Sequence, residues 1–312
     1  MFLRPPCIAL LVMSLTVWCH AQDETASKTK QKQQLKVAWQ IDEGLKAPES
    51  AYLDPVTGVI FLSQIGEGGG KGKDGDGWIS KISVDGKMIE NKWVTGLNAP
   101  KGVRSYKGTL YVSDIDRIVV IDIAKSQITK VVEIPDAQFL NDLATGADGT
   151  VYVSDMAASR VYQMKDGQVS VFAEGPELEH PNGLLVDGDS LVTGGWGTGF
   201  NPEDFSTKTL GRLKKVNLRT KEITVVTPEP VAHLDGIEVD GRGGYIVTDW
   251  RNGKLFRISK KGRAKLLMSF PRGAADHAYL IDKGLIILPE MLEGTLTAFE
   301  YTPGQNKKSS DK

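Results

Sequence analysis

Six polar residues recur at long intervals along the chain, and their side chains are of the kinds that bind metals or move protons. They are Glu49, Lys101, Asn141, Asn182, Asp235 and Asp276, separated by 40 to 53 residues. Carboxylate and amide oxygens are the ligands that calcium prefers. Three carboxylates brought together also repel one another in a low-dielectric pocket unless a cation offsets them. The set contains no histidine or thiolate, which makes zinc a poorer match. We therefore predict a divalent cation site, most favourably for calcium.

Lys101 is the one cation in this set, and it leaves a second interpretation open. An ammonium group can neutralise a carboxylate such as Asp235 without any metal. It can instead stabilise a developing oxyanion or bind an acidic substrate, which would make Lys101 catalytic. A third interpretation is that the Asn-Gly and Asp-Gly pairs only form tight turns. Turn formation explains one such pair more readily than six polar residues in register.

Three histidines lie beside members of the set. His180 and His233 each come two residues before a member, and His277 directly follows one. A histidine near a metal-bound water can act as a general base. We therefore predict that one of these histidines takes part in catalysis; the alternative is that each is a hydrogen-bonded turn residue.

The six polar residues are positioned by six sequence repeats, and each repeat begins at one of them. An alternating apolar stretch follows each of them, then a turn, then a strand such as the YVSD segments that end at Asp114 and Asp155. Four-stranded propeller blades repeat at about this spacing, roughly 40–50 residues. A lone blade cannot bury both faces, so blades stack around an axis. The sequence predicts an all-β, six-bladed β-propeller with four-stranded antiparallel blades over residues 35–301.

This topology places the six polar residues together. The start of each innermost strand and the end of the next strand lie at one face, because the two strands are antiparallel. We expect the strand at residues 35–40 to complete the last blade and close the ring, which removes open sheet edges. Two longer intervals mark insertions at residues 66–77 and 196–211. Trp196 opens the second insertion, and we expect Trp196 and Asp276 to contact a small-molecule ligand at the mouth.

The N-terminus has the features of an export signal. Arg4 precedes an apolar run at residues 7–18, and Ala21 ends a cleavage site, so residues 1–21 are predicted to be a signal peptide. A retained anchor is the alternative, although the run is short for stable membrane insertion. We predict a secreted or periplasmic protein, with a disordered spacer at residues 22–34 and a disordered tail at residues 302–312.

Composition excludes several classes of function. Both cysteines lie inside the predicted signal peptide, so the mature protein would have no disulfide, thiol nucleophile or cysteine-based zinc site. The formal net charge is −1, which gives no sign of a nucleic-acid partner. The glycine-rich loop at residues 69–74 lacks the spacing of a P-loop or the ligands of an EF-hand, and we interpret it as a flexible surface loop.

The chain resembles the senescence marker protein/gluconolactonase/luciferin-regenerating-enzyme-like propellers over nearly all of residues 35–301. The resemblance rests on four segments, in which Glu49 precedes AYLDP, Asn141 lies in LND, Asn182 lies in PNG and Asp235 lies in LDG. In that family the corresponding residues surround a divalent ion, usually calcium. The resemblance implies that Glu49, Asn141, Asn182 and Asp235 are the ligands, and that Asp235 also acts as the base in lactone hydrolysis.

One position departs from the family pattern. Sugar-lactonase members carry a substrate-contacting Arg two residues before the blade-three Asn, and this chain has Phe139 there. Phe139 is therefore expected to contact a more apolar ligand than a sugar lactone. We predict an exported metal-dependent hydrolase of a lactone or related ester. The alternative is a non-catalytic propeller that binds a small ligand or a protein partner at the same mouth, since this fold supports many functions.

Overall fold

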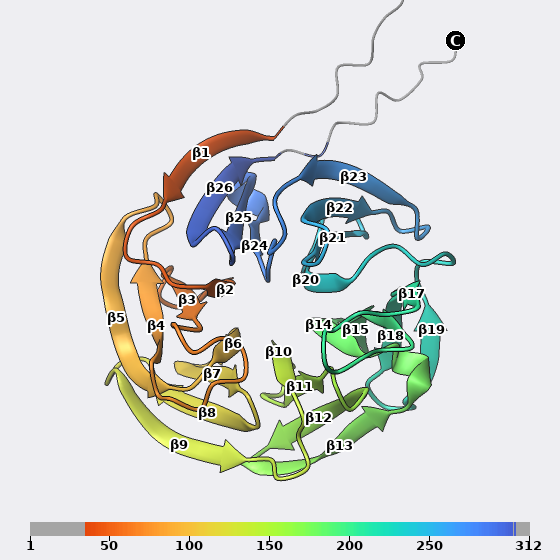
Figure 1. Ribbon diagram of the computed structural model, residues 1–312, viewed down its shortest axis with the longest axis horizontal. Helices are drawn as coiled ribbons and strands as arrows, with labels where there is room; N and C mark the ends of the chain where they lie inside the picture. The colour runs from red at the N-terminus through yellow and green to blue at the C-terminus, as the bar shows by residue number, and fades with distance from the viewer. Residues whose placement is uncertain (1–34, 302, 304–312) are drawn as a thin grey trace, which may run out of the picture. The chain divides into compact units, whose positions relative to one another are not determined.

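The computed structural model describes residues 35–301 and 303; the predicted signal peptide and spacer lie outside this part, as does the predicted tail except for Pro303. It contains six four-stranded antiparallel sheets, which confirms the predicted fold class. Figure 1 shows the sheets arranged as blades around one axis. Apart from two short 3₁₀ turns, η1 (Pro176–Leu178) and η2 (Ile281–Lys283), the described residues hold no helix, and so none that could cross a membrane.

The first three blades each take four consecutive strands from the axis outward. Blade 1 is β2 (Pro48–Leu53), β3 (Ile60–Gln64), β4 (Gly77–Ile82) and β5 (Met88–Leu97). Blade 2 is β6 (Pro100–Tyr106), β7 (Thr109–Asp114), β8 (Arg117–Asp122) and β9 (Gln127–Glu133). Blade 3 is β10 (Leu140–Thr145), β11 (Val151–Asp155), β12 (Arg160–Lys165) and β13 (Gln168–Glu174).

The second three blades add an inserted hairpin and the ring closure. Blade 4 is β14 (Pro181–Asp187), β15 (Ser190–Gly195), β18 (Leu213–Asn217) and β19 (Ile223–Val225). The pair β16 (Gly197–Thr198) and β17 (Thr209–Leu210) lies in its insertion. Blade 5 is β20 (Leu234–Val239), β21 (Tyr245–Asp249), β22 (Lys254–Ile258) and β23 (Ala264–Ser269). Blade 6 is β24 (Ala278–Leu280), β25 (Leu285–Glu290), β26 (Thr295–Glu300) and β1 (Lys36–Ile41).

The N-terminal strand closes the ring as predicted. β1 pairs antiparallel with β26, with Lys36 opposite Glu300 and Ile41 opposite Leu296. The indole nitrogen of Trp39 on β1 also donates a hydrogen bond of 3.0 Å to the Val84 carbonyl of blade 1. β1 therefore ties the last blade to the first, and the first and last parts of the ring cannot separate without breaking this ladder.

The core is divided among the interfaces between neighbouring blades. For example, Phe61 and Ile79 of blade 1 pack with Leu110 and Val112 of blade 2. A comparable buried apolar cluster lies between each further pair, including blades 6 and 1. Burial of these side chains is the main favourable term in holding the blades together. The polar residues can therefore gather near the axis, away from these apolar interfaces.

Candidate metal centre

The innermost strands share one irregularity that directs side chains toward the axis. In blade 1, Pro48 pairs with Gln64, and the ladder resumes only at Ala51. The same break follows the first residue of the innermost strand in blades 2 to 5. Glu49 and its counterparts sit in this break, where the backbone is bent out of the regular ladder. The pattern explains why a polar residue at this position of each repeat reaches the mouth.

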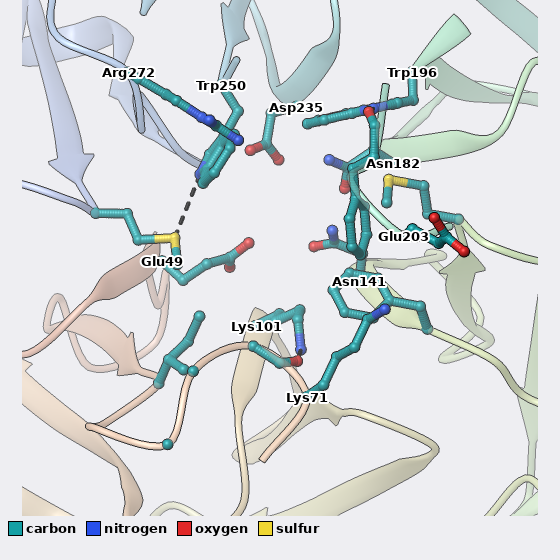
Figure 2. Close-up of a pocket in the computed structure, with 18 residues that line it drawn as sticks. Glu49, Lys71, Lys101, Asn141, Asn182, Trp196, Glu203, Asp235, Trp250 and Arg272 are labelled. Atoms are coloured by element: carbon teal, nitrogen blue, oxygen red, sulfur yellow. Dashed lines mark hydrogen bonds between the residues drawn. The ribbon is translucent and has the colours of Figure 1, made fainter. Parts of the chain in front are cut away.

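Five of the six predicted residues line one cavity of about 440 Å³ at the mouth: Glu49, Lys101, Asn141, Asn182 and Asp235. We call these five the ring residues. All are buried, with exposed fractions of 7% or less. Figure 2 shows their side chains pointing from different blades toward a common space. The prediction that these residues meet at one mouth is confirmed for this set.

Four of the ring residues direct an unpaired oxygen into this space. Within the described residues, no hydrogen-bond donor reaches Glu49 Oε2, Asn141 Oδ1, Asn182 Oδ1 or Asp235 Oδ1. Leaving a buried acceptor unpaired costs on the order of 1–3 kcal/mol each. Four such oxygens from four blades therefore fit a hard cation, which takes oxygen ligands. The described residues contain no cluster of three or more His, Cys, Asp and Glu side chains suited to a metal, so a cation here depends on the two amides.

The raised pKa values of the two ring carboxylates also favour a bound cation. Burial, and next the Asp276 carboxylate, raise the pKa of Glu49 well above its ordinary value, although Lys101 opposes this shift. Burial and the Glu49 carboxylate similarly raise the pKa of Asp235. The protein alone thus disfavours two negative charges here, and a bound cation would offset that cost.

Asp276 does not belong to the ring, and its predicted place at the mouth is wrong. Glu290 at the end of β25 lies opposite Ala274, so the residue equivalent to Glu49 is Ala275. Asp276 lies one residue deeper, beside Ser50, whose hydroxyl donates a 2.5 Å hydrogen bond to Asp276 Oδ2. The ring therefore has a small apolar residue in blade 6, between the acidic ring residues of blades 5 and 1.

Asp276 belongs to a second, deeper polar layer that the sequence did not predict. Arg104 donates a hydrogen bond of 3.0 Å from Nη1 to Asp276 Oδ2, and its Nη2 lies 3.8 Å from Asp142 Oδ1. Burial raises the pKa of Asp142 to about 7 even though Arg104 opposes the shift. Arg104 is thus the cation of the deeper layer. One feature of the sequence could have predicted this layer. Asp142 and Asp276 are acidic, whereas the other four repeats have Gly or Ser at the equivalent position.

Lys101 reaches the cavity but pairs with no carboxylate. Its Nζ donates to the carbonyl oxygens of Gly70 at 2.9 Å and Ala99 at 3.0 Å, and lies 4.5 Å from the centre of the Phe139 ring. Burial lowers the pKa of Lys101 to about 8, although Glu49 opposes the shift. In the described residues no acidic side chain lies within salt-bridge distance of Lys101. Lys101 thus leaves the four oxygens without a hydrogen-bond donor from the described part of the chain.

The three predicted histidines do not line the cavity. His180 Nδ1 bonds to the Met156 carbonyl at 2.8 Å, and the His180 ring packs on Phe200. His233 lies behind Trp196 and pairs through Nε2 with the Thr207 hydroxyl at 3.1 Å. His277 is fully buried in the deeper layer, where burial lowers its pKa to about 4. The geometry gives none of them a direct path to a ligand in the cavity.

Phe139 and Trp196 both line the cavity, as expected of ligand contacts. They belong to an apolar wall, most of whose residues were not predicted from the sequence. The residue directly after the second strand of each blade is apolar, and five of these six residues line the cavity: Ile65, Met156, Trp196, Trp250 and Met291. The sixth, Ile115, packs beside Ile65. This recurrence is visible in the printed sequence and would have predicted the wall.

The two insertions meet over the mouth. Lys71 of the blade 1 insertion donates a 3.3 Å hydrogen bond to the Pro202 carbonyl in the blade 4 insertion. Its ammonium also lies 4.6 Å from the centre of the Phe205 ring, which packs edge-on against Phe139. The loop at residues 69–74 therefore contributes to the cavity, where a free surface loop had been expected.

Comparisons with known proteins identify the fold and no more. No protein-family model matches the chain, and no curated protein matches its sequence. A gluconolactonase from Xanthomonas campestris superposes with a TM-score of 0.61 at 15% identity, covering 86% of this chain and 89% of that one. A catalytically inactive virginiamycin B lyase from Staphylococcus aureus, crystallised with quinupristin, gives 0.58 at 14% identity, covering 86% and 99%. Similar solved structures thus include two kinds of enzyme, a gluconolactonase and a lyase.

Proposed function

We propose that this protein is an exported, calcium-dependent hydrolase that opens a lactone or cleaves a related ester at the propeller mouth. The observation that carries the proposal is the set of four unpaired oxygens from Glu49, Asn141, Asn182 and Asp235 on one cavity. The predicted signal peptide supports export. The gluconolactonase neighbour supports the reaction class, at the level of a shared fold.

The donor set fits a calcium ion. Two carboxylates and two amides supply only oxygen, which is the coordination that calcium prefers. Glu49, Asn141, Asn182 and Asp235 would hold the ion. When bound, a divalent ion supplies Lewis acidity that polarises a carbonyl oxygen.

The chain's own groups account for the proton transfers. Hydrolysis forms a bond from a water oxygen to the carbonyl carbon and breaks the bond from that carbon to the ester oxygen. Asp235 lines the cavity and is the base that the family resemblance implies, so we assign it to accept the proton that water loses; the histidines lie outside the cavity. That proton passes to the departing ester oxygen, which becomes a hydroxyl. Lys101 places positive charge beside the same cavity, where it favours the oxyanion that forms during the reaction.

A panel of lactones and aryl esters, with and without a calcium chelator, tests this proposal. We expect turnover that the chelator abolishes and added calcium restores. The mass of the product separates the two reaction classes among the structural neighbours, because hydrolysis adds one water and a lyase adds none. Calcium binding without turnover on any ester would contradict the hydrolase and favour the non-catalytic ligand-binding alternative.

A further inference from the structure

The walls of the cavity select for one class of substrate. Resting on the proposed ester-cleaving function, we propose that the substrate is a lactone or ester with an apolar alkyl or aryl body, which packs against the aromatic walls above the ring residues. We expect such a molecule to be preferred over a polyhydroxylated sugar lactone.

The aromatic walls present carbon to the cavity because their polar atoms are already used. Trp196 donates its indole N–H to the Phe205 carbonyl at 2.9 Å. Trp250 directs its indole N–H to the Met291 sulfur at 3.4 Å. Phe139 and Phe205 have no polar side-chain atoms. The ligand therefore meets ring faces and thioether groups on these sides, which favour apolar surface.

The cavity has few neutral hydrogen-bonding side chains, which are the amides of Asn141 and Asn182. No Ser, Thr, Tyr, Gln or His side chain is among its lining residues. Apart from the four oxygens on the floor, its polar side chains are Lys71, Lys101, Glu203 and Arg272. Both lysines donate to backbone carbonyls, and Arg272 lies over the Trp250 ring with 4.7 Å between its Cζ and the ring centre. Against the aromatic walls, a sugar hydroxyl would lose its water without a partner, which is costly.

The aromatic walls of the cavity lie beside both insertions, and contacts between the insertions hold them in place. Phe139 and Phe205 pack edge-on against each other, and Lys71 bridges the two insertions at Pro202. Figure 2 shows Trp196, Trp250 and Arg272 around one side of the cavity and Lys71 on the other, with the ring residues between them. The ester group of a bound molecule would meet the ring oxygens, and its apolar body would fill the space under the insertions.

The test compares kcat/KM of the full-length protein on an unsubstituted γ-lactone, the same lactone with a pentyl substituent, and glucono-δ-lactone. We expect kcat/KM to rise at least about tenfold with the pentyl group, since each buried methylene is worth roughly tenfold or more in a fitted apolar pocket. Faster turnover of glucono-δ-lactone than of the pentyl lactone would overturn the substrate class while leaving the hydrolase intact.

A binding measurement separates the two proposals. The pentyl lactam has the same shape and resists hydrolysis, and its binding is followed by calorimetry and by quenching of tryptophan fluorescence. Binding of the lactam without turnover of any ester would overturn the hydrolase and support the ligand class. Failure to bind the lactam, together with no preference for the pentyl lactone, would overturn the ligand class.

Phe205→Ala and Phe200→Ala form a matched pair of variants. Phe205 lines the cavity, whereas Phe200 packs behind it against Phe205 and His180. We expect Phe205→Ala to reduce the preference for the pentyl lactone about tenfold and Phe205→Leu to restore most of it, with Phe200→Ala near wild type. An unchanged preference in a folded Phe205→Ala protein would contradict the proposed role of the wall.

Discussion

Arg104 of blade 2 donates a hydrogen bond of 3.0 Å to Asp276 of blade 6, across the axis of the propeller and beneath the candidate metal centre. Both side chains are buried, at 6% and 1% exposure. The pair divides the charged groups near the axis into two layers. Arg104 neutralises carboxylates in the deeper layer, whereas four oxygens at the mouth remain unpaired within the described residues and available to a ligand.

Replacing Arg104 with Met should destabilise the protein strongly. The change leaves Asp276 and Asp142 buried without their cation, which costs about 3–5 kcal/mol when one partner of a buried pair is removed. Urea denaturation measures the loss. Lys36→Met is the control, because Lys36 and Glu300 are 75% and 54% exposed and such a pair contributes at most about 1 kcal/mol. Equal, small losses in both variants would contradict the layered arrangement.

Glu238 should make the folded protein less stable as the pH rises. Burial raises the pKa of Glu238 from 4.5 to about 8, against the opposing effect of Arg104. The folded state then holds more protons than the unfolded state between these two values, so the free energy of unfolding falls across that window. Glu238→Gln should remove up to about 1.4 kcal/mol per pH unit from this slope. Denaturation curves from pH 5 to 8 that coincide in slope for both proteins would exclude this contribution.

Gly183→Ala should damage both stability and the metal centre. A Cβ at this position would lie 1.7 Å from the backbone oxygen of Asp235, because the innermost strands of blades 4 and 5 approach closely there. Overpacking of this kind costs about 1–3 kcal/mol and would displace a ring residue. At Gly70, which also lines the cavity, the nearest atoms would lie 3.9 Å away, so Gly70→Ala is the matched control. Thermal melting and calcium titration of the two variants check the difference.

The sequence predicted the fold well because each blade has its own turn, strand and polar residue, and six copies reinforce one another. It misplaced Asp276 because the hairpins that separate ring residues from the ends of the second strands differ in length, between 13 and 15 residues. Spacing alone therefore cannot choose between Ala275 and Asp276. The choice of the acidic residue gave a register error of one position, which moves a side chain to another layer.

The contacts of the side chains at the mouth were harder to predict. His180 and His233 precede ring residues in the sequence and His277 follows Asp276, but their rings turn toward Met156, Thr207 and the deeper layer. Arg104 and Phe205 have no repeat-wide counterpart, and their positions depend on contacts between blades that are far apart in the sequence. Local spacing predicts which face a residue lies on, whereas these tertiary contacts decide what it touches.

The Asp235 carboxyl group should lower the melting temperature without calcium and raise it with calcium. Without the ion, Asp235→Asn removes a carboxyl group whose ionised form is disfavoured by burial and by Glu49, so the variant in chelator should melt at a higher temperature than wild type. With calcium, the order should reverse, because only the wild type gains binding free energy in the folded state. A lower melting temperature for Asp235→Asn in both conditions would contradict the proposed electrostatics.

Calorimetric titration of the purified protein with calcium is the most direct test of the metal centre. We expect one ion to bind per chain, Asp235→Asn to abolish that binding, and Asp276→Asn to retain it because Asp276 lies in the deeper layer. Absence of calcium binding by the wild-type protein, or equal loss in both variants when each remains folded, would contradict a site built from Glu49, Asn141, Asn182 and Asp235.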